Sequence, residues 1–416
     1  MISSYDPLIC TLCGSHDATT LLESSTGRGM TSDSRIVRRN LRKVQCNVCG
    51  LVRDGLPFAA CELEQHYSAN YTLNVAKSGE EHVFYSASGA TARSRLIHDW
   101  ILDLKSETNW PVGVRVLEVG CGQGSLLNQL RGTFPSAHLF GIDLSAQAVA
   151  LANARGLNVR QGGLETLSGE KYDIIIAFGV LEHVSNPRMF LAQVRELLAE
   201  EGEAILGQPM QDVPSYDVFF VDHLHHFTTD HVRSLGENVG FTQTGLRAGN
   251  PLSRNFSLHH FRKSRQVCDA TACSSATVSK CAEAIAIYQR VFSSLDDCLA
   301  KLGDNERIAV FGTGEVFTFL YTYSSLHSRK ILCGLDDNAD RQANHNWPFP
   351  VVSPDQAKVF GVSTVLLCVN TMYNDLLLER LSRLDMPGVT VLYLSDKLQE
   401  GWLSFSVRTS LQSSPS

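Results

Sequence analysis

Four cysteines near the start of the chain have the spacing of metal ligands. They form two matching pairs, Cys10/Cys13 and Cys46/Cys49, and a glycine follows each pair directly. A C-x-x-C turn can direct two thiolates at one ion, and two such turns supply the four sulfurs that structural Zn²⁺ takes in tetrahedral geometry. The spacing therefore predicts one structural Zn²⁺ on these four thiolates. The alternative is four unrelated thiols.

A second group of residues has the pattern of a cofactor-binding turn. The apolar run 116–119 leads into Gly120, Gly122 and Gly124, and apolar residues at helical spacing follow. Glycine permits positive φ and carries no Cβ, so a ligand can lie against the backbone there. A second apolar run ends in Asp143, about 20 residues further on, where a doubly wound fold places the acid that accepts ribose hydroxyls. The spacing predicts an adenosine-containing cofactor without choosing between a dinucleotide and another type.

Acid–base chemistry is expected in the stretch 216–228, which contains three histidines and two aspartates. Imidazole titrates near neutrality, and a neighbouring carboxylate can orient it. We take His223 as the first candidate base, His225 as the second and Asp222 as the orienting acid. Adjacent side chains of an extended segment point to opposite faces, so the orienting acid could also come from elsewhere. The alternatives are a metal site and histidines that only pack.

The elements that must position these residues alternate between strands and helices, which indicates an α/β fold with a parallel sheet. We expect strands at 114–119, 137–142, 173–178 and 202–207 and helices at 126–132, 145–155 and 187–199. After residue 281 a helix, a strand with a second glycine turn at Gly312–Gly314, and three more strands predict another nucleotide-fold domain. Phe317 occupies the third glycine position of that turn, which argues against a dinucleotide there.

The sequences of these motifs resemble those of class I S-adenosylmethionine (SAM) methyltransferases. The resemblance covers 118–124, Gly141–Ser145 and 172–184 in the family's order. It implies a Rossmann-like domain that binds SAM through Glu118, Gly120, Gly122, Gly124, Asp143 and Phe178, with Glu118 near the amino group and Asp143 on the ribose.

The order of the parts also resembles the sugar C-methyltransferases, which act on nucleotide-linked keto-sugars. It implies a zinc-binding module at 1–60, a SAM domain with a helical lead-in at 61–263 and a C-terminal Rossmann-like domain at 281–403. The Ser-, Thr- and Ala-rich composition of 264–280 predicts a linker, and we expect a disordered tail at 404–416. That family typically shows a Tyr-His-Glu-His element. This chain has residues 220–223 there, which keep the last histidine and an acid (Asp222) but not the tyrosine.

The composition of the chain bears on where the protein is expected to be located and on what it is expected to bind. The chain has 416 residues, 44% of them hydrophobic, and a formal net charge of -7, which argues against non-specific nucleic-acid binding. No apolar run approaches the roughly 18 residues of a membrane span. We expect a cytoplasmic location, because no secretory signal is visible and the paired cysteines suit a reducing compartment. Oligomeric state is left open.

These observations predict a SAM-dependent methyltransferase, with C-methylation next to a ketone of a nucleotide-linked sugar as the preferred reaction. One alternative is O- or N-methylation of another small molecule. Two others belong to different classes: an NAD-dependent oxidoreductase that uses Gly312–Gly314, and a non-catalytic protein that binds SAM and zinc.

Overall fold

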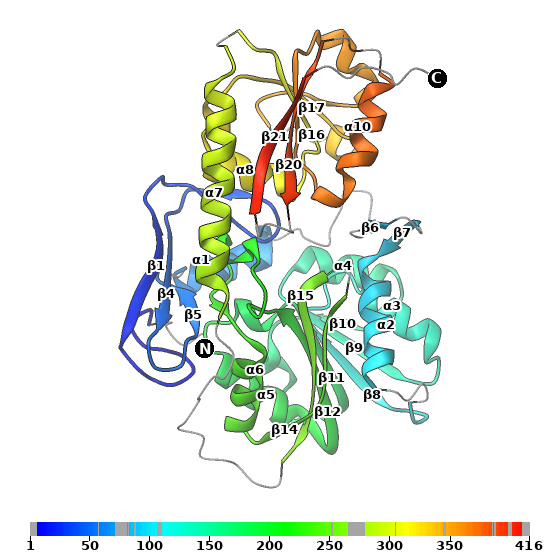
Figure 1. Ribbon diagram of the computed structural model, residues 1–416. Helices are drawn as coiled ribbons and strands as arrows, with labels where there is room; N and C mark the ends of the chain where they lie inside the picture. The colour runs from blue at the N-terminus through cyan, green and yellow to red at the C-terminus, as the bar shows by residue number, and fades with distance from the viewer. Residues whose placement is uncertain are drawn as a thin grey trace. The chain divides into compact units, whose positions relative to one another are not determined.

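The computed structural model describes residues 6–56, 58–70, 81, 83–86, 89–105, 110–250, 253–264, 279–303, 305–343, 347–384, 386, 388–397 and 402–409. The chain divides into two compact units, coloured by residue number in Figure 1. One unit holds Met1–Ser24 and Leu41–Ala282, and the other holds Ser25–Asn40 and Glu283–Ser416. The segment 25–40 therefore groups with the C-terminal unit, although it lies in sequence within the expected zinc-binding module. Most of the expected linker and the end of the expected tail lie outside the described residues.

The first unit is built on a seven-stranded sheet. In spatial order its strands are β10 (Val159–Gln161), β9 (His138–Asp143), β8 (Arg115–Val119), β11 (Tyr172–Phe178), β12 (Leu198–Pro209), β15 (Ser253–Lys263) and β14 (Phe241–Asn250). The first five run parallel, whereas β15 pairs antiparallel with both β12 and β14. The predicted parallel α/β sheet is confirmed, and the four expected strands lie within a few residues of β8, β9, β11 and β12.

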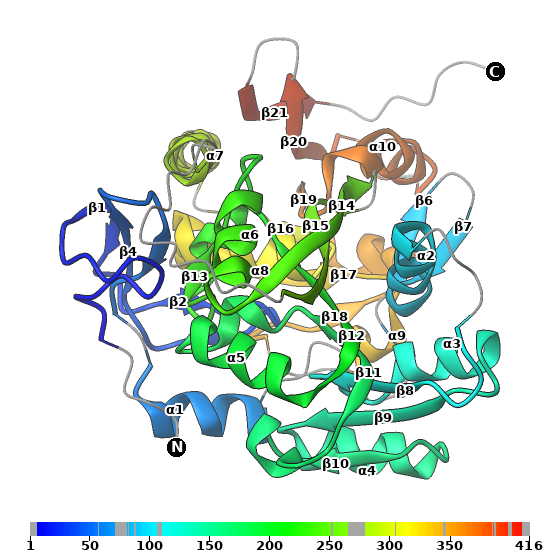
Figure 2. The same cartoon turned by 90° about the horizontal axis from the view of Figure 1, so that it is seen from below.

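Helices cover both faces of this sheet (Figure 2). They are α2 (Arg93–Lys105), α3 (Ser125–Thr133), α4 (Ala146–Ala154), α5 (Pro187–Leu197) and α6 (Thr229–Asn238). One core packs α5 and α6 against one face of β8, β11 and β12, and a second core packs α2 and α3 against the other. Central strands that are buried on both faces consist of continuous apolar residues, and β8 and β11 were therefore recognisable from the sequence.

Local chemistry fixes where α5 begins. Asn186 precedes the helix and its side-chain oxygen accepts a hydrogen bond from the Met189 amide, while Pro187 occupies the first turn. A polar N-cap followed by proline satisfies or removes the amides that a helix start leaves unpaired. The apolar side chains of the helix then fall on the side that faces the sheet.

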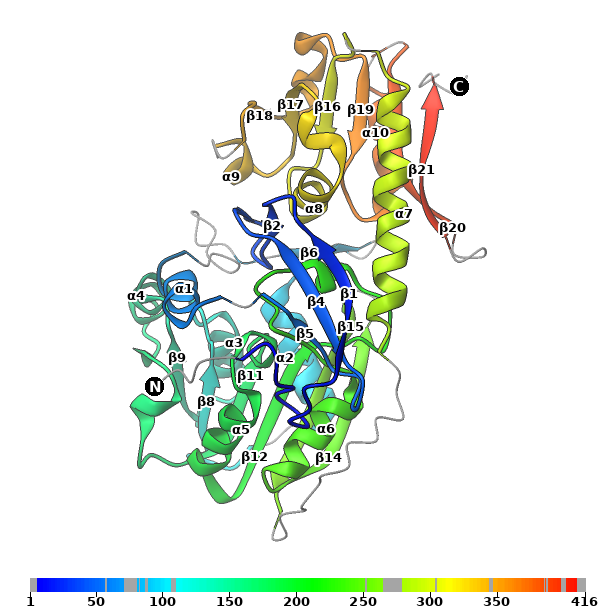
Figure 3. The same cartoon turned by 90° about the vertical axis from the view of Figure 1, so that its left-hand side faces the viewer.

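A smaller four-stranded sheet carries the N-terminal cysteines (Figure 3). Its strands are β1 (Ala18–Ser24), β4 (Leu41–Cys46), β5 (Val52–Asp54) and β13 (His225–His226), all antiparallel in that order. The last strand belongs to the stretch with the three histidines, so this stretch is hydrogen-bonded directly to the N-terminal sheet. Along the chain, β5 is followed by α1 (Ala60–Gln65), a π-helical turn (His66–Asn70), β6 (Val83–Ser86) and β7 (Gly89–Ala92), and α2 comes next.

The second unit contains a six-stranded sheet, which confirms the second Rossmann-like domain. In spatial order its strands are β18 (Val351–Val352), β17 (Ile331–Leu335), β16 (Ile308–Phe311), β19 (Thr364–Leu367), β20 (Thr390–Lys397) and β21 (Trp402–Thr409). Its helices are α7 (Cys281–Ala300), α8 (Glu315–Tyr323), α9 (Ala339–Gln342) and α10 (Asn374–Ser382). The expected end at residue 403 was too early, because β21 pairs antiparallel with β20 as far as Thr409.

A short hairpin from the N-terminal part of the chain completes this unit. It consists of β2 (Gly29–Met30) and β3 (Ile36–Val37), and it packs on α8. The Tyr323 hydroxyl accepts a hydrogen bond from the Met30 amide, and the Arg28 guanidinium donates to the Tyr321 carbonyl. Among the helices in the described part of the chain, none is long and apolar enough to cross a membrane.

Candidate cofactor and acid–base site

The four N-terminal cysteines come together in one cluster. The sulfurs of Cys10, Cys13, Cys46 and Cys49 all lie within 4.8 Å of one another, and the Cys10–Cys49 and Cys13–Cys46 pairs are each 3.5 Å apart. A tetrahedral Zn²⁺ with bonds of about 2.3 Å requires sulfur separations of about 3.8 Å. The residues present therefore fit the predicted ion, although the metal itself stays a proposal.

The two halves of the cysteine cluster have the same backbone design. The Gly14 amide donates to the Cys10 carbonyl and the Gly50 amide to the Cys46 carbonyl, at 2.8 and 2.9 Å. Both glycines have positive φ (74° and 79°), which a side chain would disfavour. Each C-x-x-C-Gly segment is therefore one tight turn that directs two sulfurs to the same point.

The cluster is fastened to the rest of its unit. His231 of α6 lies 2.8 Å from the Cys49 carbonyl, and Arg188 of α5 donates to the Leu12 carbonyl at 2.8 Å. Three of the four cysteines are buried in the same core as the apolar residues of β8 and β11. Loss of the cysteine cluster would therefore disturb the packing of α5 and α6.

The first glycine turn connects β8 to α3 as predicted. Gly120, Gly122 and Gly124 all have positive φ (69°, 53° and 77°). A Cβ on Gly120 would lie 2.7 Å from Val180, and one on Gly124 would lie 2.3 Å from Leu157. The turn thus needs glycine for its backbone conformation and for the close approach of its neighbours.

The structure places both predicted acids of the cofactor site beside this turn. Asp143, at the end of β9, accepts hydrogen bonds from the Gly122 and Ser145 amides, each at 2.8 Å. Glu118 is 6% exposed, and its Oε2 has no hydrogen-bond partner among the residues that the structure describes. Burial, with the Asp143 charge, raises the pKa of Glu118 to about 8 against the opposing effect of Arg93. A buried carboxylate oxygen of this kind, beside a glycine turn, fits a ligand that carries a positive group.

Phe178 ends β11 next to the glycine turn. Its ring stacks on Phe256 with centroids 5.3 Å apart, and the Arg93 guanidinium lies 5.0 Å from its centroid. Directly after it, Gly179 has positive φ (70°), and Val180 meets Gly120. The short segment 178–183 therefore leads from the glycine turn to a second group of polar residues.

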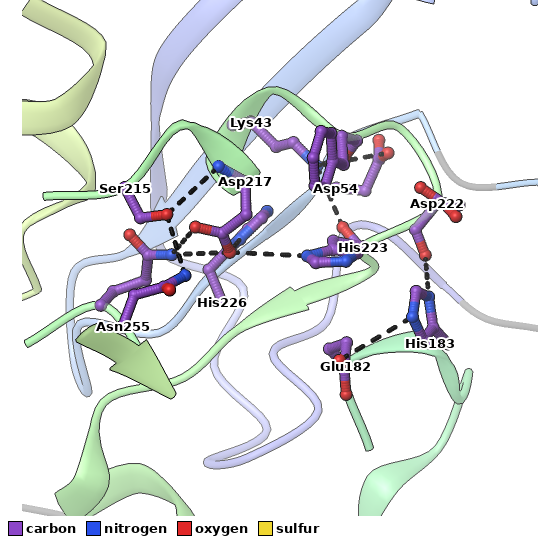
Figure 4. A network of polar contacts seen from close by, with 12 residues as sticks. Lys43, Asp54, Glu182, His183, Ser215, Asp217, Asp222, His223, His226 and Asn255 are labelled. Carbon is purple, nitrogen blue, oxygen red and sulfur yellow. Dashed lines mark hydrogen bonds and ion pairs between the residues drawn. The ribbon is translucent and has the colours of Figure 1, made fainter. Parts of the chain in front are cut away.

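That second group is a buried cluster of titratable side chains (Figure 4). Glu182 and His183 lie in a 3₁₀ turn (Leu181–His183), and Asp217 lies in another (Tyr216–Phe219). His223 Nδ1 is 3.5 Å from Asp217 Oδ2, and its ring packs edge-on against His183 with centroids 4.8 Å apart. His226 Nδ1 is 3.7 Å from the same Asp217 oxygen. All five side chains are buried.

The surroundings separate the pKa values of these groups. Burial alone would lower the pKa of His223, but the bond to Asp217 and the charges of Asp222, Asp217 and Glu182 outweigh it and raise that pKa. Burial raises the pKa of Glu182 to about 7. Burial also lowers the pKa of His183 to about 4 and that of His226 to about 3. His223 is therefore the histidine of this cluster that is stabilised as a cation, and groups separated in this way suit acid–base chemistry.

Two sequence-based pairings need correction. The carboxylate of Asp222 lies 3.5 Å from His66, whereas the carboxylate 3.5 Å from His223 is that of Asp217. His225 points the other way, with Nε2 2.9 Å from the Thr11 hydroxyl, and burial lowers its pKa to about 3. The reason is local: β13 places His225 opposite Arg53 of β5, so its side chain faces the N-terminal module.

A lysine from the N-terminal sheet holds the loop that carries His223. Lys43 of β4 is fully buried and donates to the Phe220 and His223 carbonyls at 2.7 and 3.0 Å. Asp54 of β5 lies 3.7 Å from its ammonium group. Burial lowers the pKa of Lys43, and the Asp54 charge opposes that effect. The cysteine-bearing sheet thus positions the candidate base through a side chain.

Side chains around the second glycine turn, Gly312–Gly314, contact one another. Phe317 is fully buried and packs edge-on against Trp347 with centroids 4.6 Å apart. Asp336, at the position of a ribose-binding acid, accepts hydrogen bonds from the Thr313 amide and hydroxyl at 2.8 and 2.9 Å. Arg341 donates to the same oxygen at 3.1 Å. The acid is therefore engaged within the unit.

Sequence reasoning did not identify several residues of the site. They are Lys43, Arg93, Glu182, His183 and Asp217. Of these, Glu182 and His183 stand in a motif that was recognised, and Asp217 stands in the histidine-rich stretch 216–228. Lys43 and Arg93 gave no local signal, because each acts on residues far away in sequence.

The strand order, the glycine turn and the acids at the ends of β8 and β9 together define the Rossmann-like fold of class I methyltransferases. A family model described as a methyltransferase domain matches residues 90–244. A ubiquinone biosynthesis O-methyltransferase of Paraburkholderia phytofirmans is 30% identical over 171 residues, which are 35% of this chain and 73% of that protein. The chain belongs to the family of SAM-dependent methyltransferases.

Other similarities are more partial. A malonyl-[acyl-carrier protein] O-methyltransferase of Bacillus cereus is 26% identical over 118 residues, covering 27% of this chain and 44% of that protein. The chain spans about half the length of this and other curated relatives that it matches. A SAM-dependent methyltransferase structure from Mesorhizobium loti aligns at 17% identity and a TM-score of 0.35, over 40% of this chain and 98% of that one.

Proposed function

We propose that the protein transfers the methyl group of SAM to a carbon next to a ketone, on a sugar linked to a nucleotide. The observation that carries this proposal is the direct connection between two sites. The segment 178–183 starts beside the glycine turn and Glu118, and it ends in the cluster that contains His223. A candidate base and a candidate SAM site thus share one short piece of chain.

The residues around the glycine turn fit SAM. Gly120, Gly122 and Gly124 offer backbone without side chains, Glu118 offers a buried carboxylate for the ammonium group, and Asp143 offers carboxylate lone pairs for the ribose hydroxyls. When bound, SAM supplies an electrophilic methyl group, which the substrate carbon takes while S-adenosylhomocysteine is left behind. Phe178 then forms one wall of the pocket.

His223 is the proposed base. The carboxylate of Asp217 lies 3.5 Å from His223 Nδ1 and favours the tautomer in which Nδ1 carries the proton. In that tautomer, Nε2 accepts the proton from the substrate's α-carbon. The imidazolium that forms is stabilised by Asp217 and by the charge of Asp222. The electron pair of the broken C–H bond is then delocalised onto the ketone oxygen until the new C–C bond forms. Asp222 acts through its charge and through His66, and His225 is no longer a candidate.

The sugar substrate is supported by the order of parts along the chain, with a four-cysteine cluster first, the SAM domain second and a further Rossmann-like unit third. We propose that the cysteine cluster holds one structural Zn²⁺ and that the C-terminal unit binds substrate without a dinucleotide. The engaged Asp336 and the buried Phe317 support the second point and disfavour an NAD-dependent oxidoreductase.

The test is a panel of nucleotide-linked keto-sugars incubated with the protein in deuterated water. With SAM omitted, we expect exchange of the α-proton of the true substrate, and with SAM present, a methyl group on that carbon. His223→Ala should lower turnover about 10²- to 10⁴-fold and leave SAM affinity nearly unchanged. If the protein binds SAM but neither exchanges protons nor methylates any member of the panel, the sugar proposal fails.

A second candidate is O-methylation of a small molecule. Several curated relatives are named as O-methyltransferases, which favours it, and one from Papaver bracteatum is named as an N-methyltransferase. His223 would then deprotonate a hydroxyl group. A product with the methyl group on oxygen, located by NMR, would select this candidate over C-methylation.

A further inference from the structure

We propose that Asp217, His223 and His226 form a binding site for one divalent transition-metal ion, for which Zn²⁺ is the probe. The ligand atoms are one carboxylate oxygen of Asp217 and the Nδ1 atom of each histidine. The site is separate from the four-cysteine cluster and consists of two imidazoles and one carboxylate. Only its effect on catalysis rests on the proposed function.

The distances between these three groups are longer than hydrogen bonds and suit a shared ion. Asp217 Oδ2 lies 3.5 Å from His223 Nδ1 and 3.7 Å from His226 Nδ1 (Figure 4), whereas an N–H···O hydrogen bond spans about 2.7–3.2 Å. Metal bonds of about 2.0–2.2 Å in tetrahedral geometry separate two ligand atoms by about 3.3–3.6 Å. One ligand atom from each residue lies within 4.8 Å of the other two. Small ring rotations would therefore close the set around one ion.

The two histidines have buried nitrogens that the protein does not satisfy. The side chain of His226 is 1% exposed, and neither of its ring nitrogens has a hydrogen-bond partner among the residues that the structure describes. The same holds for His223 Nδ1. Buried polar atoms are normally paired, so each exception calls for an explanation such as an ion. A metal ion on Nδ1 would satisfy one nitrogen in each ring and would neutralise the carboxylate between them.

A neighbouring amide holds the carboxylate of the site in place. Gln211 Nε2 donates to both carboxylate oxygens of Asp217 at 2.9 Å. The Gln211 backbone amide donates to the Phe227 carbonyl at 2.7 Å, and Phe227 directly follows His226. Outer hydrogen bonds of this kind orient the ligands of a metal and contribute to its affinity. Gln211 is therefore the positioning residue of the site.

The charge of Lys43 limits the strength of the site. Its ammonium group acts electrostatically on both Asp217 and His226. It would repel a divalent ion, and the site offers only three ligands, of which one is anionic. We therefore expect Zn²⁺ to bind here more weakly than four thiolates would bind it. Such an ion should be added and removed readily in solution.

The test is a titration of the full chain with Zn²⁺, followed by calorimetry, for the wild type, His226→Phe, Gln211→Leu and His259→Phe. His259 is the matched control, because it is a fully buried histidine of the same unit whose Nδ1 lies 3.0 Å from Gln243. Ions on the four-cysteine cluster are common to all four proteins and cancel in the comparison. We expect the wild type to bind one ion more per chain than His226→Phe, and the control to match the wild type. Gln211→Leu should weaken that ion about 10- to 100-fold.

A second measurement needs no variant and therefore decides the matter even if His226→Phe does not fold. NMR of the ring nitrogens should show Zn²⁺ on His223 Nδ1 and the proton on Nε2. Equal Zn²⁺ uptake by the wild type and a folded His226→Phe would overturn the proposal. Zn²⁺ on His223 Nε2 would also overturn it, because the ion would then lie with Glu182 and His183, which form another group of ligand spacing with His223.

A bound ion would act on the proposed reaction. With Nδ1 on the ion and the proton on Nε2, His223 has no lone pair left to accept the substrate's α-proton. Zn²⁺ should therefore inhibit turnover of the wild type, and whatever turnover His226→Phe has should resist this inhibition. If Zn²⁺ binds Nδ1 as expected but turnover is unchanged, the metal site stands and the assignment of His223 as the base fails.

Discussion

Replacing Asp217 by asparagine should lower the pKa of His223. In the wild type, burial favours neutral imidazole, whereas Asp217 at 3.5 Å and the charges of Asp222 and Glu182 favour the cation, and the second effect is larger. Asparagine keeps the shape of the side chain and removes its charge. Burial remains, so the balance shifts towards neutral imidazole.

The magnitude follows from the distance. An opposite charge within about 4–6 Å moves a pKa by about 1–3 units, which corresponds to about 1.4–4 kcal/mol. We therefore expect the pKa of His223 to fall from above its ordinary value to below it. Because a base works in its deprotonated form, the variant should keep its plateau rate to a lower pH than the wild type. Its maximal rate should be lower, because a less basic imidazole accepts the proton less readily.

The assay is a titration of the histidine ring nitrogens by NMR, which needs no substrate, followed by a pH profile of turnover once a substrate is known. Asp222→Asn is the matched comparison, because that carboxylate lies on His66 and reaches His223 only through its charge. The reasoning is refuted if Asp222→Asn lowers the pKa of His223 more than Asp217→Asn does.

Three further outcomes can be checked on the isolated protein. Cys46→Ser should abolish binding of about one Zn²⁺ per chain, as measured by elemental analysis, whereas the exposed Cys61→Ser should retain it; a metal-free wild type that is fully folded would contradict this. Asp143→Ala should weaken SAM binding about 10- to 100-fold by calorimetry, because each hydrogen bond to a charged acceptor contributes about 1.5–3 kcal/mol; equal affinity would show that the ribose site lies elsewhere. Lys43→Met should destabilise its unit by about 3–5 kcal/mol in urea unfolding, since the buried Asp54 loses the charge of Lys43; an unchanged midpoint would refute that role.

The fold of the central domain was predictable because its signals are local. The buried strands are continuous apolar runs, the turn has its glycines in sequence, and Asp143 ends a strand at the spacing that the fold requires. The four cysteines were predictable for the same reason, since each pair sits within one turn. The antiparallel strands β14 and β15 were not singled out.

The partners of the candidate base could not be read from the sequence. His223 and Asp222 are adjacent, yet the backbone turns each towards a different neighbour, so adjacency was misleading. Asp217 is six residues away and reaches His223 because a 3₁₀ turn folds the chain back. Lys43 approaches from a strand about 180 residues earlier, and such long-range contacts leave no trace in a local pattern.

The hairpin of β1 and β4 has a consequence for how this protein can be cut or expressed in parts. Its cysteine end belongs to the first unit, while its tip, residues 25–40, packs on α8 in the second. The polypeptide therefore passes between the two units three times, after residues 24, 40 and 282. A truncated chain that stops at residue 282 would leave Met30, which is fully buried in the whole chain, without its cover. The C-terminal half expressed alone would lack a hairpin that its own helix α8 packs against, so neither half is an autonomous piece of the sequence.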